Sequence, residues 1–186
     1  MDLKKGEKLV RLARNSVEAY FRGEKVSSKV DGDGGIFVTI HRYPSNELRG
    51  CIGFIDRKSL SRVRDAALSA AFFDSRFLPL KEGELNSIIF EVSILSELEE
   101  VEIKNERDFK KIKIGRDGLV IEKNKNKGLL LPQVAKEHKW DVGEFLEYCC
   151  LKAGLSQEEW RDAKIFKFQC DVFKEEKPKG KIVKVK

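Results

Sequence analysis

The heptapeptide Leu48-Arg49-Gly50-Cys51-Ile52-Gly53-Phe54 decides how this chain is interpreted, because two glycines flank a cysteine within a strand-like stretch. Glycine inside a strand marks a bulge or the close approach of another part of the chain. If the large apolar residues of the stretch point toward the core, Arg49 and Cys51 share the opposite face, and Gly50 and Gly53 leave space beside the thiol. The stretch therefore predicts one strand of a hairpin with a cysteine on its open face.

The segment before this heptapeptide supplies the other half of the hairpin. Ile36 to Arg42 alternates between apolar and polar residues as a strand does, and Pro44, Ser45 and Asn46 are turn residues. The chain can then return through Leu48 to Ile55. We expect an antiparallel pair.

The rest of the chain mixes helix-like and strand-like segments. Helical spacing of apolar residues occurs in Leu3 to Arg22, Val63 to Phe73 and Asp141 to Gly154, and Asn105 to Lys111 reads as a short capped helix. Strand-like patterns occur in Ile88 to Leu95, Leu119 to Glu122, Gly128 to Leu131 and Phe166 to Val172. This order lacks the regular spacing of a parallel doubly wound sheet, so it predicts an α+β fold with an antiparallel sheet and packed helices. If there are two closely associated subdomains, their seam lies near residues 98–104.

Length and composition bound the class of protein. The chain has 186 residues, of which 41% are hydrophobic and 37% charged. This length and composition are sufficient for one sizeable hydrophobic core. Its longest apolar runs, such as Ala70 to Phe73, fall far short of the roughly 18 residues that a membrane helix needs, and the first residues have no apolar signal core. These features predict a cytoplasmic protein. The 25 lysines and 20 glutamates against three glutamines resemble the composition of a thermophile.

Four cysteines without a signal peptide indicate free thiols in a reducing compartment. Cys149 and Cys150 are neighbours on the apolar face of a predicted helix, and Cys170 lies in a strand-like segment, so all three are expected in the core. No CxxC pair, P-loop, dinucleotide fingerprint or HExxH motif occurs. We therefore expect neither a metal nor a cofactor.

The formal net charge of +6 raises the question of nucleic acid. Residues 174–186 carry +4 of this charge and the rest of the chain only +2, so we expect a solvated basic tail after a domain that spans residues 1–173. The body has no RNA-recognition aromatic pair, helix-turn-helix signature or dense arginine stripe, which argues against nucleic-acid binding.

LRGCIG at Leu48 to Gly53 closely resembles the signature of the AMMECR-type domain family, whose members include archaeal and bacterial proteins. Further blocks resemble the family in the family's order: Ala66 to Leu80, Glu91 to Leu95, Gly115 to Ala135 and Trp140 to Leu155. The resemblance implies a single α+β unit with two subdomains. It also implies Memo-like and radical-SAM-like pathway partners, without implying a reaction.

Three functions follow as hypotheses. The first is a binding module that contacts a small anionic ligand or a protein through Arg49, Gly50, Gly53, Asp74 and Arg76. The second is an enzyme with Cys51 as nucleophile and His41, placed diagonally across the hairpin, as base. The third is RNA binding through the basic tail and the lysines scattered along the chain.

Each of these residues also has a structural interpretation. Cys51 can be a small apolar filler and His41 a surface strand residue. Asp74 and Arg76 can form an ion pair that fixes a loop while Phe77, Leu78 and Leu80 enter the core. Sequence alone leaves these alternatives open.

Overall fold

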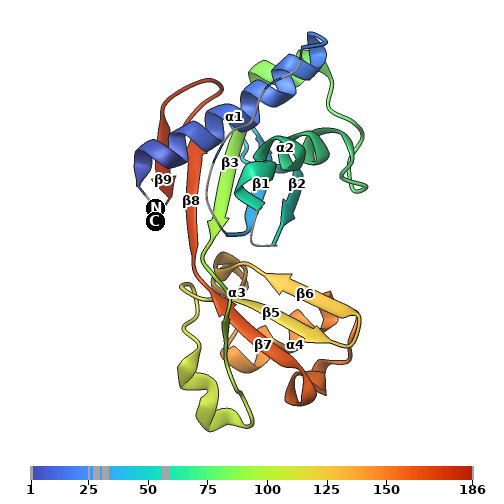
Figure 1. The fold of residues 1–186 in the computed structure, drawn as a ribbon, viewed down its shortest axis with the longest axis vertical. Coiled ribbons are helices and arrows are strands. Elements are labelled where there is room, and N and C mark those ends of the chain that lie inside the picture. The colour runs from blue at the N-terminus through green and yellow to red at the C-terminus, as the bar shows by residue number, and fades with distance from the viewer. Residues whose placement is uncertain (1, 25, 27–29, 31–33, 56–58, 186) are drawn as a thin grey trace. The chain divides into compact units, whose positions relative to one another are not determined.

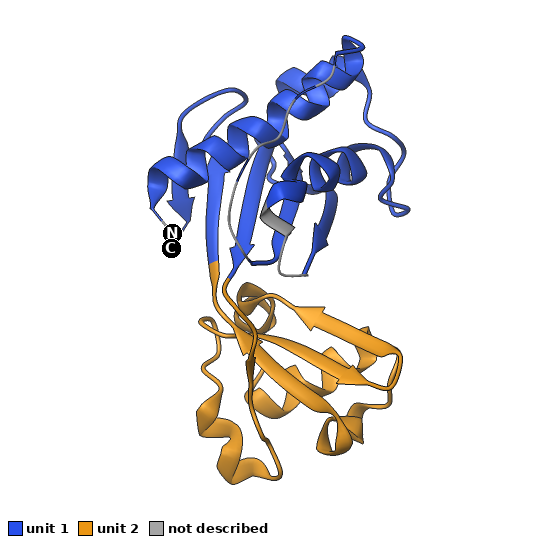
Figure 2. Ribbon diagram, viewed as in Figure 1, with its two compact units in different colours: residues 1–95, 171–186 blue, residues 96–170 orange. Residues whose placement is uncertain are grey.

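The computed structural model describes residues 2–24, 26, 30, 34–55 and 59–185, and within them it confirms the α+β class with two antiparallel sheets (Figure 1). Two compact units divide the chain, one of residues 1–95 with 171–186 and the other of residues 96–170 (Figure 2). The chain passes from the first unit to the second between Leu95 and Ser96 and returns between Cys170 and Asp171, so residues 98–104 belong to the second unit.

The first unit is a five-stranded sheet with two helices on one of its faces. Its strands lie in the order β2-β1-β3-β8-β9, with bounds Ile36–Arg42 (β1), Leu48–Phe54 (β2), Ile88–Leu95 (β3), Cys170–Glu175 (β8) and Ile182–Val185 (β9). Helices α1 (Leu3–Phe21) and α2 (Val63–Phe72) lie on the same side of this sheet in Figure 1. Ile36, Val38 and Ile40 alternate toward these helices and are completely buried, as strand periodicity requires.

The second unit is a four-stranded sheet packed against α4 (Val142–Lys152). Its strands lie in the order β4-β7-β5-β6, with bounds Glu99–Glu100 (β4), Gly118–Lys123 (β5), Asn126–Leu130 (β6) and Lys164–Phe168 (β7). The Asp141–Glu144 capping box opens α4, and Gly154 follows it at φ +74°. Cys149 and Cys150 are fully buried in this core, as predicted. A short helix α3 (Pro132–His138) completes the unit, with 3-10 turns at Glu106–Lys111 (η3) and Gln157–Asp162 (η4).

The end of the chain differs from the sequence-based expectation. The single strand predicted over residues 166–172 is two strands in different sheets, β7 and β8, separated by Gln169. Cys170, expected in the core, is only half-buried. The segment predicted as a solvated tail holds the buried Glu175 and the strand β9, whose Ile182 joins the core of the first unit. The net charge of the segment could not predict this packing, because two buried residues among many lysines suffice to anchor the segment.

None of the helices in the described residues is long and apolar enough to cross a membrane.

Candidate functional site

The signature strand β2 lies at the edge of the first unit's sheet, paired with β1 on one side. Thr39 stands directly opposite Cys51, and the register shifts between Ile40 and His41, so Arg49 has no opposite partner on β1. Because of this irregularity, Arg49 does not follow the regular alternation of side chains between the two faces of the sheet that the sequence predicted. The other edge of β2 is available to residues that follow α2.

Arg49 is buried and forms an ion pair with the half-buried Glu84. Its side chain is 5% exposed, and its Nε and Nη2 donate to the two carboxylate oxygens of Glu84 at 2.8 and 3.0 Å. The guanidinium holds the pKa of the Glu84 carboxyl below its usual range. Glu84 belongs to the 3-10 turn Glu82–Ser87 (η2) just before β3, so this pair ties β2 to the start of β3.

Asp74 and Arg76 close the free edge of β2 at Cys51. Cys51 N donates to Asp74 Oδ2 at 2.8 Å, and Arg76 Nη2 donates to Cys51 O at 3.4 Å. Arg76 also donates from Nε to Asp74 Oδ1 at 2.9 Å and from Nη2 to Asp74 Oδ2 at 2.7 Å. Two side chains thus satisfy the outward backbone groups of one edge residue, as a neighbouring strand would. The two charges bind each other and fix the loop after α2.

Gly50 and Gly53 allow neighbouring parts of the chain to pack closely against β2. A Cβ on Gly50 would lie 2.1 Å from Ala70 O, so glycine lets the backbone of α2 approach the sheet. A Cβ on Gly53 would lie 2.3 Å from the Phe37 ring and 2.5 Å from Ile36 O. Both glycines therefore admit neighbouring protein atoms at the places where the sequence suggested space beside the thiol.

The Cys51 thiol is half-buried, and its hydrogen-bond partner is Thr39, whose Oγ1 donates to Sγ at 3.2 Å. Burial raises the pKa of this thiol, and the Thr39 hydrogen bond only partly opposes the rise. A thiol with a raised pKa is less reactive at neutral pH than an activated nucleophile requires.

His41 makes its contacts elsewhere. Its Nδ1 lies 3.3 Å from Asn46 O, and its Nε2 lies 3.4 Å from Glu91 Oε2, without hydrogen-bond geometry to any of the described residues. Glu91 in turn pairs with Lys174 at 3.6 Å, and Lys174 donates to the Asn46 side chain. Within the described part of the chain, the structure brings Cys51 to Thr39 and His41 to Glu91, and it forms no hydrogen bond between the two predicted catalytic residues.

The loop Phe73 to Leu80 exposes two large apolar side chains whose exposure the sequence did not predict. Leu80 is buried as expected and Phe77 is half-buried, but Leu78 is 80% exposed, and Phe73 is 74% exposed. Leu80 N donates to Ala71 O at 2.8 Å and Phe77 N to Asp74 O at 3.0 Å, so the loop is internally bonded. One feature of the sequence is consistent with this exposed loop. Apolar residues continue past the end of the helix and are followed by the turn-forming Asp74-Ser75-Arg76.

No group of three or more potential ligand residues that could hold a metal ion occurs in residues 2–24, 26, 30, 34–55 and 59–185.

The accessibility of the thiols gives a first prediction. We expect iodoacetamide to alkylate Cys51 and Cys170, both half-buried, well before Cys149 and Cys150 in the native protein. Burial raises the pKa of Cys149 to about 12 and that of Cys150 to about 11, which protects them further. Mass spectrometry of timed samples reads the order. An alkylation midpoint for Cys51 below that of a free thiol would contradict this description of its environment.

Asp74 gives a pH-dependent prediction. Arg76 and two backbone amides lower the pKa of this carboxyl from 3.8 to about 2. Because the folded pKa is depressed, the stabilisation is complete above about pH 4 and is lost as the pH falls toward 2, and it amounts to about 2 kcal/mol. The difference in unfolding free energy between wild type and Asp74→Asn should therefore shrink by this amount between pH 5 and pH 2. A constant difference would show that Asp74 is not ionically held.

These observations define a class of α+β protein. Its edge strand carries glycines on both sides of a cysteine, and an Asp–Arg pair from the loop after the next helix binds the free edge of that strand. A family model described as AMMECR1 matches residues 10–173, and the chain belongs to this family. It is similar to Protein MJ0810 of Methanocaldococcus jannaschii, with 41% identity over all of this chain and 98% of that protein. It is also similar to Protein PF1979 of Pyrococcus furiosus, with 45% identity over 95% and 91% of the two chains. The crystal structure of the uncharacterized protein PH0010 from Pyrococcus horikoshii is similar to this fold with a TM-score of 0.90 and 41% identity, covering 100% and 98% of the chains.

Proposed function

We propose that this protein is a protein-binding module whose contact surface is the loop Phe73 to Leu80, and that it acts with Memo-like and radical-SAM-like proteins. The observation that carries the proposal is the exposure of Phe73 and Leu78, 74% and 80%, on a loop fixed to the edge of β2. Large apolar side chains held in water cost free energy unless a partner covers them. Arg76, whose side chain is half-exposed, lies between them in the sequence.

Fixing the loop before binding favours affinity. Asp74 and Arg76 hold the backbone of the loop in place, so less conformational entropy is lost when a partner docks. In this interpretation Arg49, Gly50, Gly53 and Asp74 are positioning residues, while Phe73, Arg76 and Leu78 contact the partner. The signature supports this through its backbone and packing rather than through its thiol.

The enzyme hypothesis rests on a thiol and a base in contact. Cys51 is instead hydrogen-bonded to Thr39 and its pKa is raised, which supports binding over nucleophilic catalysis. The RNA hypothesis rests on a free basic tail, whereas β9 is a strand of the sheet. Both observations leave the loop as the better-supported surface.

The test is binding of a purified Memo-like protein and a purified radical-SAM-like protein, each from the same genome, measured by titration calorimetry. Burial of Phe and Leu side chains contributes about 1.5–3 kcal/mol each, so the double variant Phe73→Ser/Leu78→Ser should lose about 100-fold or more in affinity. The control Leu3→Ser/Leu151→Ser changes two other exposed apolar residues, 43% and 47% exposed, and should bind as wild type does.

Two outcomes would overturn the proposal. If the loop variant binds as tightly as wild type, the loop is not the contact surface. If wild type binds neither protein, the assignment of partners is wrong.

A further inference from the structure

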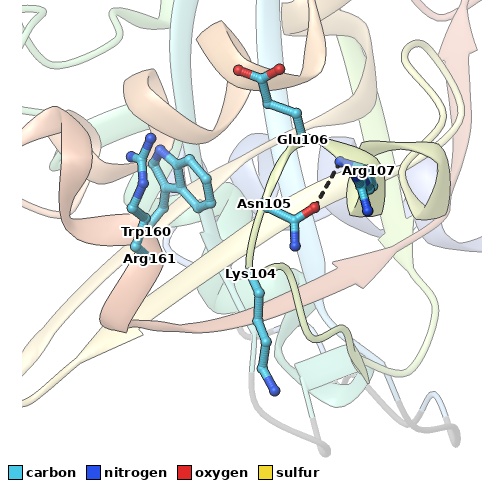
Figure 3. A pocket seen from close by; sticks show the side chains of 6 residues that line it. All are labelled: Lys104, Asn105, Glu106, Arg107, Trp160 and Arg161. Carbon is cyan, nitrogen blue, oxygen red and sulfur yellow. Dashed lines mark hydrogen bonds between the residues drawn. The ribbon is translucent and has the colours of Figure 1, made fainter.

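The second unit carries a surface pocket of about 520 Å³ that is separate from the loop Phe73 to Leu80. Lys104 and Asn105 line it from the segment before η3, Glu106 and Arg107 from the start of η3, and Trp160 and Arg161 from η4, as Figure 3 shows. This volume lies in the range of small-molecule sites. The chemistry of the lining side chains indicates what such a molecule must carry.

The pocket offers hydrogen-bond donors almost exclusively. Asn105 Oδ1 already accepts from Arg107 N at 3.0 Å, which leaves the Asn105 amide NH₂ as its free group. Lysine, arginine and tryptophan side chains donate and do not accept. Glu106 is the one carboxylate of the lining, and Figure 3 shows it extending in the opposite direction from Lys104.

Two of the three cationic side chains that line the pocket already have a carboxylate partner. Lys104 pairs with Glu102 at 2.7 Å, and Arg161 is hydrogen-bonded to Glu158. Arg107 has no carboxylate partner within the described residues. Arg161 is also held over the Trp160 ring, with its Cζ 4.3 Å from the ring centroid, which restricts its guanidinium to the pocket wall.

Trp160 forms the wall on which Arg161 is held. Its side chain is buried, and its Nε1, which has no acceptor in the part of the chain that the structure describes, is enclosed by protein and cannot donate to a molecule in the open pocket. The donors left to the pocket are therefore the Arg107 guanidinium and the Asn105 amide, next to the exposed carboxylate of Glu106.

We propose that this pocket binds a small molecule through an oxyanion, either a phosphate or a carboxylate group. Arg107 supplies the uncompensated cation, Arg161 a second guanidinium fixed on Trp160, and Asn105 a neutral donor. Guanidinium groups match the two oxygens of such anions. The proposal does not depend on the protein-binding function of the loop.

Tryptophan fluorescence tests the proposal directly, because Trp160 lines the pocket and the chain has only two tryptophans. In a Trp140→Phe background Trp160 is the sole reporter, and phenylalanine keeps an aromatic ring between His138 and Tyr148. Pyrophosphate and citrate are titrated at constant ionic strength, and these two probes distinguish phosphate from carboxylate. We expect a saturable change with at least one of them below about 1 mM.

Arg107→Gln in that background should raise the dissociation constant about tenfold or more, since a hydrogen bond to a charged group is lost. Lys110→Gln is the matched control, because Lys110 is an exposed cation of the same η3 turn that does not line the pocket. It should leave the constant within about twofold. If Arg107→Gln loses its circular dichroism, Arg161→Gln replaces it with the same expectation. Absence of saturation with both probes, or equal weakening by Lys110→Gln, would overturn the proposal.

Discussion

Glu175→Ala should destabilise the protein by about 3–5 kcal/mol, because it leaves a buried arginine without its main counter-charge. Arg14 and Glu175 are 4% and 3% exposed, and Arg14 Nε and Nη2 each lie 2.6 Å from a carboxylate oxygen of Glu175. The same carboxylate accepts Phe90 N at 3.0 Å, and Arg14 Nη2 also donates to Ile88 O at 2.7 Å. One ion pair thus joins α1, β3 and β8.

The neighbouring Glu176→Ala is the matched control. Glu176 is exposed and its backbone N donates to Lys181 O, so removing its side chain should change stability by less than about 0.5 kcal/mol. Equilibrium unfolding in guanidinium chloride measures both variants. Equal stability of the two variants would show that residues 174–186 are the dispensable tail that charge alone suggested.

Gly50→Ala should destabilise the protein by about 3 kcal/mol or more, since a single added methyl group meets backbone rather than a movable side chain. The new Cβ would stand 2.1 Å from Ala70 O and 3.1 Å from Ala70 C, so α2 must move away from the sheet. Because α2 leads directly into the loop Phe73 to Leu80, the variant should also weaken partner binding.

Gly83→Ala makes the identical chemical change where a Cβ meets no heavy atom within 4 Å. This variant should be as stable as wild type or slightly more so, because alanine restricts the unfolded chain. Comparison of the two variants by thermal and guanidinium unfolding removes any effect of the glycine-to-alanine change itself. Similar stabilities would contradict the close approach of α2 to Gly50.

Local signals in the sequence predicted most elements of the fold. The helical periodicity of Leu3 to Arg22 and the Asp141–Glu144 capping box each depend on residues within a few positions of one another, and both are present. The assignment of the last strands failed for the opposite reason. β7 and β8 continue one alternating pattern, and only pairing with strands more than 40 residues away separates them into two sheets.

The candidate site was predicted in part. The sequence indicated that Arg49, Cys51, Asp74 and Arg76 belong to one region, and Asp74 and Arg76 do meet Cys51. It could not show that Asp74 binds the backbone of Cys51 rather than a ligand, or that Glu84, 35 positions away, neutralises Arg49. The exposure of Leu78 could not be predicted either. An apolar residue in a loop belongs to no periodic pattern that would indicate whether its side chain points to the core or to solvent.

We propose that the signature strand β2 positions the loop Phe73 to Leu80 and that the Cys51 thiol takes no part in partner binding. The most direct test measures the affinity of the purified Memo-like or radical-SAM-like protein for two folded variants, Cys51→Ser and Phe73→Ser/Leu78→Ser. We expect Cys51→Ser, in which a serine hydroxyl can still contact Thr39, to bind within a few-fold of wild type, while the loop variant loses about 100-fold or more. Loss of binding in Cys51→Ser with full binding in the loop variant would contradict the claim.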